Sequence, residues 1–133
     1  MTATITVTEV LVKSASAFVL AMGSLSVLNG TRLLGNSSVF VPKTQSTALA
    51  ESQIRYFGGM GAALGAIGWW AASDLPVRLV PLAIAGMGPF VGGLGRGLAG
   101  WRHGFGEGMW GAMWAELVIP VVVWGVGRGE GVW

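Results

Sequence analysis

Residues 51–65 read ESQIRYFGGMGAALG and open an apolar run that continues to residue 70. Glu51 and Arg55 stand four positions apart at the head of this stretch, so they share one helix face and can form an ion pair. Small residues follow, and such a surface lets a second helix approach closely: Gly58, Gly59, Gly61, Ala62 and Gly65. The stretch therefore predicts a membrane-embedded helix with a charged pair at its start and a packing face of small residues.

The composition of the whole chain points to the same class of protein. Of the 133 residues, 53% are apolar and only 11% are charged, whereas ordinary soluble domains carry about 25% charged residues. So few charges cannot cover a soluble surface of this size, and the class that fits is integral membrane. The net charge of +2 comes without a Lys/Arg cluster, which argues against a nucleic-acid partner.

The residue inventory also restricts the chemistry. The chain has no cysteine and a single histidine, His103, so disulfides and thiolate chemistry are excluded and a zinc site has too few ligands. We expect neither a metal nor a cofactor. The first apolar run lacks a basic leader and a small-residue cleavage site, so we interpret it as a retained helix rather than a signal peptide.

Four apolar segments of spanning length are separated by polar or Pro/Gly-rich breaks. We predict a single all-α domain, a four-transmembrane-helix bundle with antiparallel neighbours and Gly-rich helix packing. The expected spans are about residues 10–28, 51–72, 77–98 and 109–126, with a polar loop at 30–50 and a flexible end at 127–133. An even number of crossings places both termini on one side of the membrane. For the second and third spans we expect glycine contacts, with Gly58, Gly61 and Gly65 against Gly88 and Gly92.

Polar residues gather at one end of this predicted bundle. Glu116 lies about 10 Å inside that end, counted at 1.5 Å per residue from the start of the last span. A carboxylate at that depth is costly unless another helix supplies a partner, and we predict a cluster of Glu116 with Arg55 and Arg96, with Glu51 at its rim. Further candidates for a substrate-binding role lie at the same end of the bundle or along the last span: Tyr56, Trp114, Asn29 and Arg32.

Three interpretations of this cluster remain open. Buried ion pairs often serve only to fix the register of a helix bundle. The same charges can form a pocket in which Glu116 or Glu51 acts as acid or base and Arg55 or Arg96 stabilises an anionic oxygen. Proton or ion transport is the third interpretation, and one deep carboxylate in a chain without internal repeats supports it least.

Several short patterns together resemble a known family. They are Glu51-x-x-x-Arg55-x-x-Gly58-Gly59, a third span that ends in residues 92–96, GGLGR, and residues 115–120, AELVIP. In combination they are similar to the domain of unknown function 4345 family, small four-helix membrane proteins, over nearly the whole chain. The resemblance implies four transmembrane helices with Glu51, Arg55, Arg96 and Glu116 as the polar signature, and it implies no reaction.

Two functions from different classes follow. The first is a cofactor-free membrane isomerase or cyclase that acts on a lipophilic, terpenoid-like or polyketide-like intermediate. It rests on the acid–base pair and on an analogy of architecture with other small membrane enzymes. The alternative is a non-enzymatic membrane scaffold or accessory subunit in which the charges only lock the bundle. The expected surroundings are the lipid bilayer, that of the endoplasmic reticulum if the source is eukaryotic, and the sequence allows a homo-oligomer.

Overall fold

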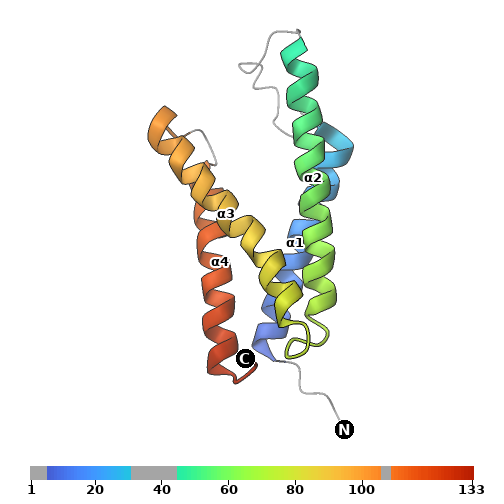
Figure 1. Cartoon of the computed structure of the whole chain (residues 1–133), viewed down its shortest axis with the longest axis vertical. Helices are drawn as coiled ribbons and strands as arrows, with labels where there is room; N and C mark the ends of the chain where they lie inside the picture. The colour runs from blue at the N-terminus through green and yellow to red at the C-terminus, as the bar shows by residue number, and fades with distance from the viewer. Residues whose placement is uncertain (1–5, 31–44, 106–108) are drawn as a thin grey trace. The chain divides into compact units, whose positions relative to one another are not determined.

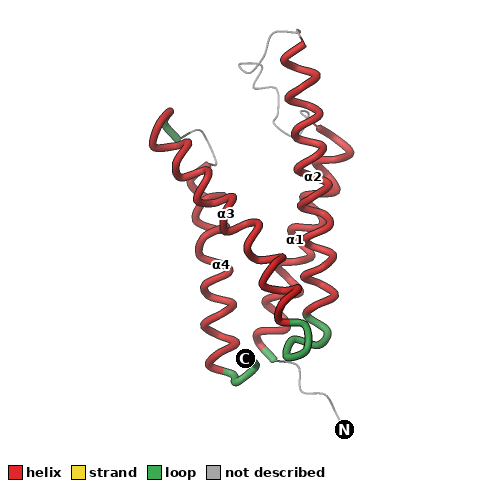
Figure 2. Tube along the Cα trace, in the orientation of Figure 1, coloured by secondary structure: helices red, strands yellow, loops and turns green. Residues whose placement is uncertain are grey.

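The computed structural model describes residues 6–30, 45–105 and 109–133, and within these residues helices joined by turns are the regular secondary structure (Figures 1 and 2). The four helices are α1 (Val7–Asn29), α2 (Gln45–Ala71), α3 (Leu79–His103) and α4 (Met109–Gly129). The prediction of an all-α chain with four helices is confirmed. The largest differences from the predicted bounds are in the middle two helices: α2 begins six residues earlier than residue 51, and α3 continues through Arg102 and His103, beyond the predicted end at residue 98.

Three of the helices are long and apolar enough to cross a membrane: α1, α3 and α4. Their apolar side chains are largely exposed, for example Phe18 at 67% and Leu28 at 73%, as expected for surfaces that face lipid rather than water. α2 is not among these three helices. Its first part carries Glu51 and Arg55, and the glycines of its second part add little hydropathy.

The chain divides into two compact units, one formed by Ala15–Ala66 and the other by Met1–Ser14 together with Ile67–Trp133. The first unit contains most of α1 and α2, and the second contains α3, α4 and the adjoining ends of α1 and α2.

Glycines bring α1 and α2 into backbone contact in the first unit. A methyl group built on Gly58 would lie 2.7 Å from Ser26 Cβ and 2.9 Å from the Gly23 carbonyl oxygen, and one built on Gly65 would lie 2.8 Å from Leu20 Cα. Only a residue without a side chain fits at such distances. Because α1 occupies this face of α2, the prediction that these glycines pack against Gly88 and Gly92 was wrong.

Helices α3 and α4 contact each other in the second unit through small residues on α3. A methyl group built on Gly93 would lie 3.0 Å from Leu117, and one on Gly97 would lie 3.3 Å from Met113. At one end of the unit, Val12, Ala72 and Leu75 form a buried apolar cluster.

The chain end was predicted to be flexible, and the structure corrects this. Val132 N–H donates to the Gly127 carbonyl and Gly131 N–H to that of Arg128, with Gly131 at a φ of +69°. This is the Schellman arrangement that satisfies the last carbonyls of a helix. The Trp133 indole N–H donates to the Trp124 carbonyl at 3.1 Å, so the final residue folds back on α4.

The carboxylate that follows α4 caps the first helix. Glu130 accepts hydrogen bonds from the backbone N–H groups of Val7 and Thr8, both at 2.9 Å, and from the Thr8 hydroxyl. Thr6 accepts from the Glu9 N–H at 3.1 Å, which completes the cap, because the first N–H groups of a helix have no partner inside it. The start of α1 and the end of α4 therefore lie together.

Candidate functional site

An ion pair between α3 and α4 is the most distinctive polar feature of the described residues. Arg96 Nε donates to Glu116 Oε2 at 2.9 Å. Arg96 lies seven residues before the end of α3 and Glu116 seven residues after the start of α4. At 1.5 Å per residue, both side chains leave the backbone about 10 Å from the helix ends. The predicted pairing of Glu116 with an arginine from another helix is confirmed for Arg96.

The backbone of α3 makes room for this carboxylate. A methyl group built on Gly93 would lie 3.1 Å from Glu116 Cβ, and one on Gly92 would lie 3.7 Å from Glu116 Oε2. A side chain at Gly93 would compete with Glu116 for the same space. The glycine pair thus lets Glu116 reach Arg96 across the helix contact, which links the sequence pattern at residues 92–96 to the ion pair.

The Arg96–Glu116 pair leaves some of its hydrogen-bonding atoms without a protein partner among the described residues. The Arg96 side chain is 48% exposed and that of Glu116 is 24% exposed. Among the described residues, Arg96 bonds to protein only through Nε, and Glu116 accepts only at Oε2. Two guanidinium nitrogens and one carboxylate oxygen therefore have no hydrogen-bond partner among the described residues.

Arg55 is engaged differently. Its Nε and Nη2 donate to Glu51 Oε1 at 3.1 and 2.6 Å, and its Nη1 donates to the carbonyl oxygens of Val27 and Leu28. The last carbonyls of a helix have no partner within it, so Arg55 and Glu51 together cap the end of α1. Each arginine thus has its own ion pair, Arg55 with Glu51 and Arg96 with Glu116, and Arg55 also binds carbonyls at the end of α1.

Comparison with known proteins adds the family. A family model described as "Domain of unknown function (DUF4345)" matches residues 7–126. The chain belongs to this family. No curated protein and no solved structure matches the chain.

The DUF4345 match contains both ion pairs, but it ends before Glu130, which caps α1.

Of the predicted substrate-binding residues, Asn29 is the last residue of α1, and Tyr56 is 63% exposed with its ring edge against Phe57. Arg32 lies outside the described residues. Among those that are described, no group of three His, Asp or Glu side chains is placed to hold a metal ion.

The DUF4345 chain also carries a row of three aromatic rings, of which the sequence indicated only the two tryptophans. Phe105, Trp110 and Trp114 stack in a row, with ring centroids 4.2 Å apart for the first pair and 6.3 Å for the second. Trp114, a predicted pocket residue, is 53% exposed. At 100° per residue, Trp114 and Glu116 leave α4 on opposite sides, so the row and the ion pair belong to different faces. The i, i+4 spacing of the two tryptophans was the available signal.

Proposed function

We propose that this DUF4345 protein spans the bilayer four times, as a bundle with antiparallel neighbours. Three helices have the length and hydropathy of spans. The 27 residues of α2 extend about 40 Å, which exceeds the hydrocarbon thickness of about 30 Å. The contact between the start of α1 and Glu130 after α4 supports an even number of crossings.

Cysteine labelling tests this topology, since the chain has no cysteine of its own. A cysteine at Thr2 and one appended after Trp133 should react with a membrane-impermeant reagent from the same side. A cysteine at Arg102 should react from the other side. Labelling of the two chain ends from opposite sides would refute the four-span arrangement.

Within that bundle we propose a cofactor-free isomerase or cyclase for a lipophilic substrate, with the Arg96–Glu116 pair as its acid–base centre. The observation that supports this is that the two arginines differ in how many of their nitrogens donate hydrogen bonds within the protein. Arg55 uses Nε, Nη1 and Nη2 within the protein, whereas Arg96 uses Nε alone among the described residues. A guanidinium needed only to lock helices would be expected to resemble Arg55.

The chemistry follows from the two side chains. The free Glu116 oxygen accepts a proton from a carbon next to a carbonyl group, and the electron pair of that C–H bond moves onto the carbonyl oxygen as an enolate. Arg96 N–H groups donate to this oxygen, which stabilises the negative charge in a medium of low dielectric constant. Protonated Glu116 then returns the proton to a different carbon, so the double bond shifts without any redox change.

A direct assay uses a long-chain β,γ-unsaturated ketone as the probe, because its isomerisation to the conjugated enone is visible by ultraviolet absorbance. Glu116→Gln should lower the rate about 10²–10⁴-fold, the usual contribution of a general acid–base group. Glu51→Gln is the matched control, since it changes the same chemical group in the capping pair and should leave the rate within a few-fold. Equal rates for wild type and Glu116→Gln would refute the catalytic role for this substrate class.

The alternative function is a membrane scaffold in which Arg96 and Glu116 only join α3 to α4, as Arg55 and Glu51 join α2 to α1. The exchanged pair Arg96→Glu with Glu116→Arg separates the two functions. A scaffold should recover its thermal stability in detergent when the charges are exchanged. The enzyme should recover stability but no isomerisation, because the carboxylate and the guanidinium no longer face the substrate from their original helices.

A further inference from the structure

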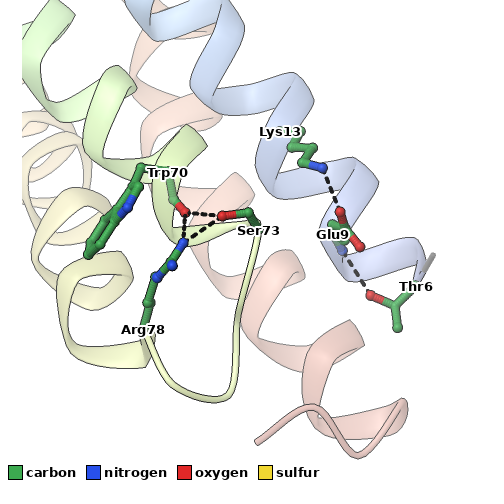
Figure 3. Close-up of polar contacts among 6 residues, drawn as sticks. All are labelled: Thr6, Glu9, Lys13, Trp70, Ser73 and Arg78. Carbon is green, nitrogen blue, oxygen red and sulfur yellow. Dashed lines mark hydrogen bonds and ion pairs between the residues drawn. The ribbon is translucent and has the colours of Figure 1, made fainter. Parts of the chain in front are cut away.

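The turn between α2 and α3 holds an arginine in a fixed position (Figure 3). Arg78 Nη1 donates to the Trp70 carbonyl oxygen at 2.8 Å and to the Ser73 hydroxyl at 2.6 Å. The guanidinium carbon lies 4.4 Å from the centroid of a Trp70 ring, a cation–π distance. The Ser73 hydroxyl donates in turn to the same Trp70 carbonyl at 2.7 Å. These contacts fix both the position and the plane of the guanidinium.

The charge of Arg78 is not neutralised by a carboxylate within the described residues. Three other cations there form ion pairs, namely Lys13 with Glu9, Arg55 with Glu51 and Arg96 with Glu116. Arg78 forms none, although Asp74 lies in the same turn. Its Nε and Nη2 also donate to no acceptor in this part of the chain. A fixed, uncompensated guanidinium with donors to spare favours an anionic ligand.

The position of Arg78 restricts what that ligand can be. Arg78 immediately precedes Leu79, the first residue of the candidate span α3. The neighbouring side chains are apolar and exposed, with Val77 at 77%, Val80 at 70% and Trp70 at 52%. Tryptophan beside a basic residue at the end of a span is typical of the boundary between hydrocarbon and headgroups. The ligand therefore combines a negative group with an apolar body.

We propose that Arg78, Trp70 and Ser73 bind the phosphate group of an anionic membrane lipid. The spare edge of the guanidinium donates to two phosphate oxygens, and the acyl chains lie along the exposed apolar side chains at the start of α3. The planar fork of arginine suits this bidentate contact better than the point charge of a lysine. This inference rests on the proposed function only in that α3 must cross the bilayer.

Native mass spectrometry of the protein in detergent tests the proposal, with phosphatidylglycerol and phosphatidylcholine titrated separately. The wild type should bind phosphatidylglycerol in preference, and Arg78→Gln should weaken that binding about fivefold, as expected for the loss of one basic side chain at an anionic surface. Arg102→Gln is the matched control, because Arg102 is an exposed arginine in the last turn of α3 and should leave the affinity unchanged. An equal loss with both variants would indicate a general charge effect and overturn the site.

Two further measurements test the lipid site even if Arg78→Gln fails to fold. The preference of the wild-type protein should fall as ionic strength rises, and Arg78→Lys, which preserves the charge of the turn, should bind with intermediate affinity. Competition by inorganic phosphate at the lipid's own concentration would assign the site to free phosphate and overturn the lipid proposal. A folded protein in detergent that binds both lipids equally overturns this inference alone, whereas cysteine labelling of the two chain ends from opposite sides overturns the membrane arrangement.

Discussion

The contact between α1 and α2 should be unusually sensitive to a single methyl group at Gly65. In Gly65→Ala the new Cβ would lie 2.5 Å from the Leu20 backbone nitrogen and 2.8 Å from both Leu20 Cα and the Ser16 carbonyl oxygen. All three are backbone atoms, so no side-chain rotation relieves the overlap. To regain contacts of about 3.5 Å, the two helices must separate locally by about 1 Å, a gap that forfeits a quarter to a half of each neighbouring dispersion contact.

The expected penalty for such overpacking is about 1–3 kcal/mol in the free energy of unfolding. Alanine also gains about 1 kcal/mol over glycine in helix propensity, which would hide part of the effect. Gly95→Ala removes this ambiguity, because a methyl group at Gly95 would meet no atom within 4 Å. The propensity gain is common to both variants, so the difference between them isolates the packing term of about 1–3 kcal/mol.

Both variants can be unfolded by titration of sodium dodecyl sulfate into mixed micelles, with helix content followed by circular dichroism. Gly65→Ala should unfold at lower denaturant than Gly95→Ala, and Gly95→Ala at or above the wild type. If the two variants are equally stable, the backbone contact between α1 and α2 is absent or yields without cost, and the account of glycine packing given above is refuted.

Three further outcomes are expected. Arg55→Gln should destabilise the protein by about 1–3 kcal/mol, because it leaves carbonyls at the end of α1 without a donor. A thermal midpoint in detergent equal to that of the wild type would contradict the capping role. Gly131→Ala should cost about 1 kcal/mol, because residue 131 has a φ of +69° that side chains disfavour, and a stabilised variant would exclude the Schellman end. The Thr8 hydroxyl, followed by the N–H groups of Thr8 and Val7, lowers the pKa of Glu130. The stability from this cap is therefore complete above the ordinary carboxyl range and is lost as the pH falls through the lowered pKa. Thermal midpoints measured against pH should show this acid loss in the wild type and a smaller one in Glu130→Gln.

Local spacing was sufficient to predict the helices and one of the two ion pairs. Glu51 and Arg55 are four residues apart and pair at 2.6 Å, as their shared helix face allows. The first span was predicted to end at residue 28, and the helix ends at Asn29, where the next residue, Gly30, adopts a positive φ. Apolar runs broken by glycine and proline predict the four helices for the same reason, since whether a segment forms a helix depends mainly on residues within a few turns.

The partners of the deep charges and of the glycines depended on tertiary structure. The sequence indicated that Glu116 needs a cation from another helix, and it predicted both Arg55 and Arg96 as partners. In the structure Arg96 pairs with Glu116, and Arg55 donates to carbonyl oxygens at the end of α1. In the same way, Glu130 and Thr8 are separated by 122 positions, and no local pattern connects them. Periodicity determines which face of a helix can pack closely, whereas only the folded chain decides which helix packs there.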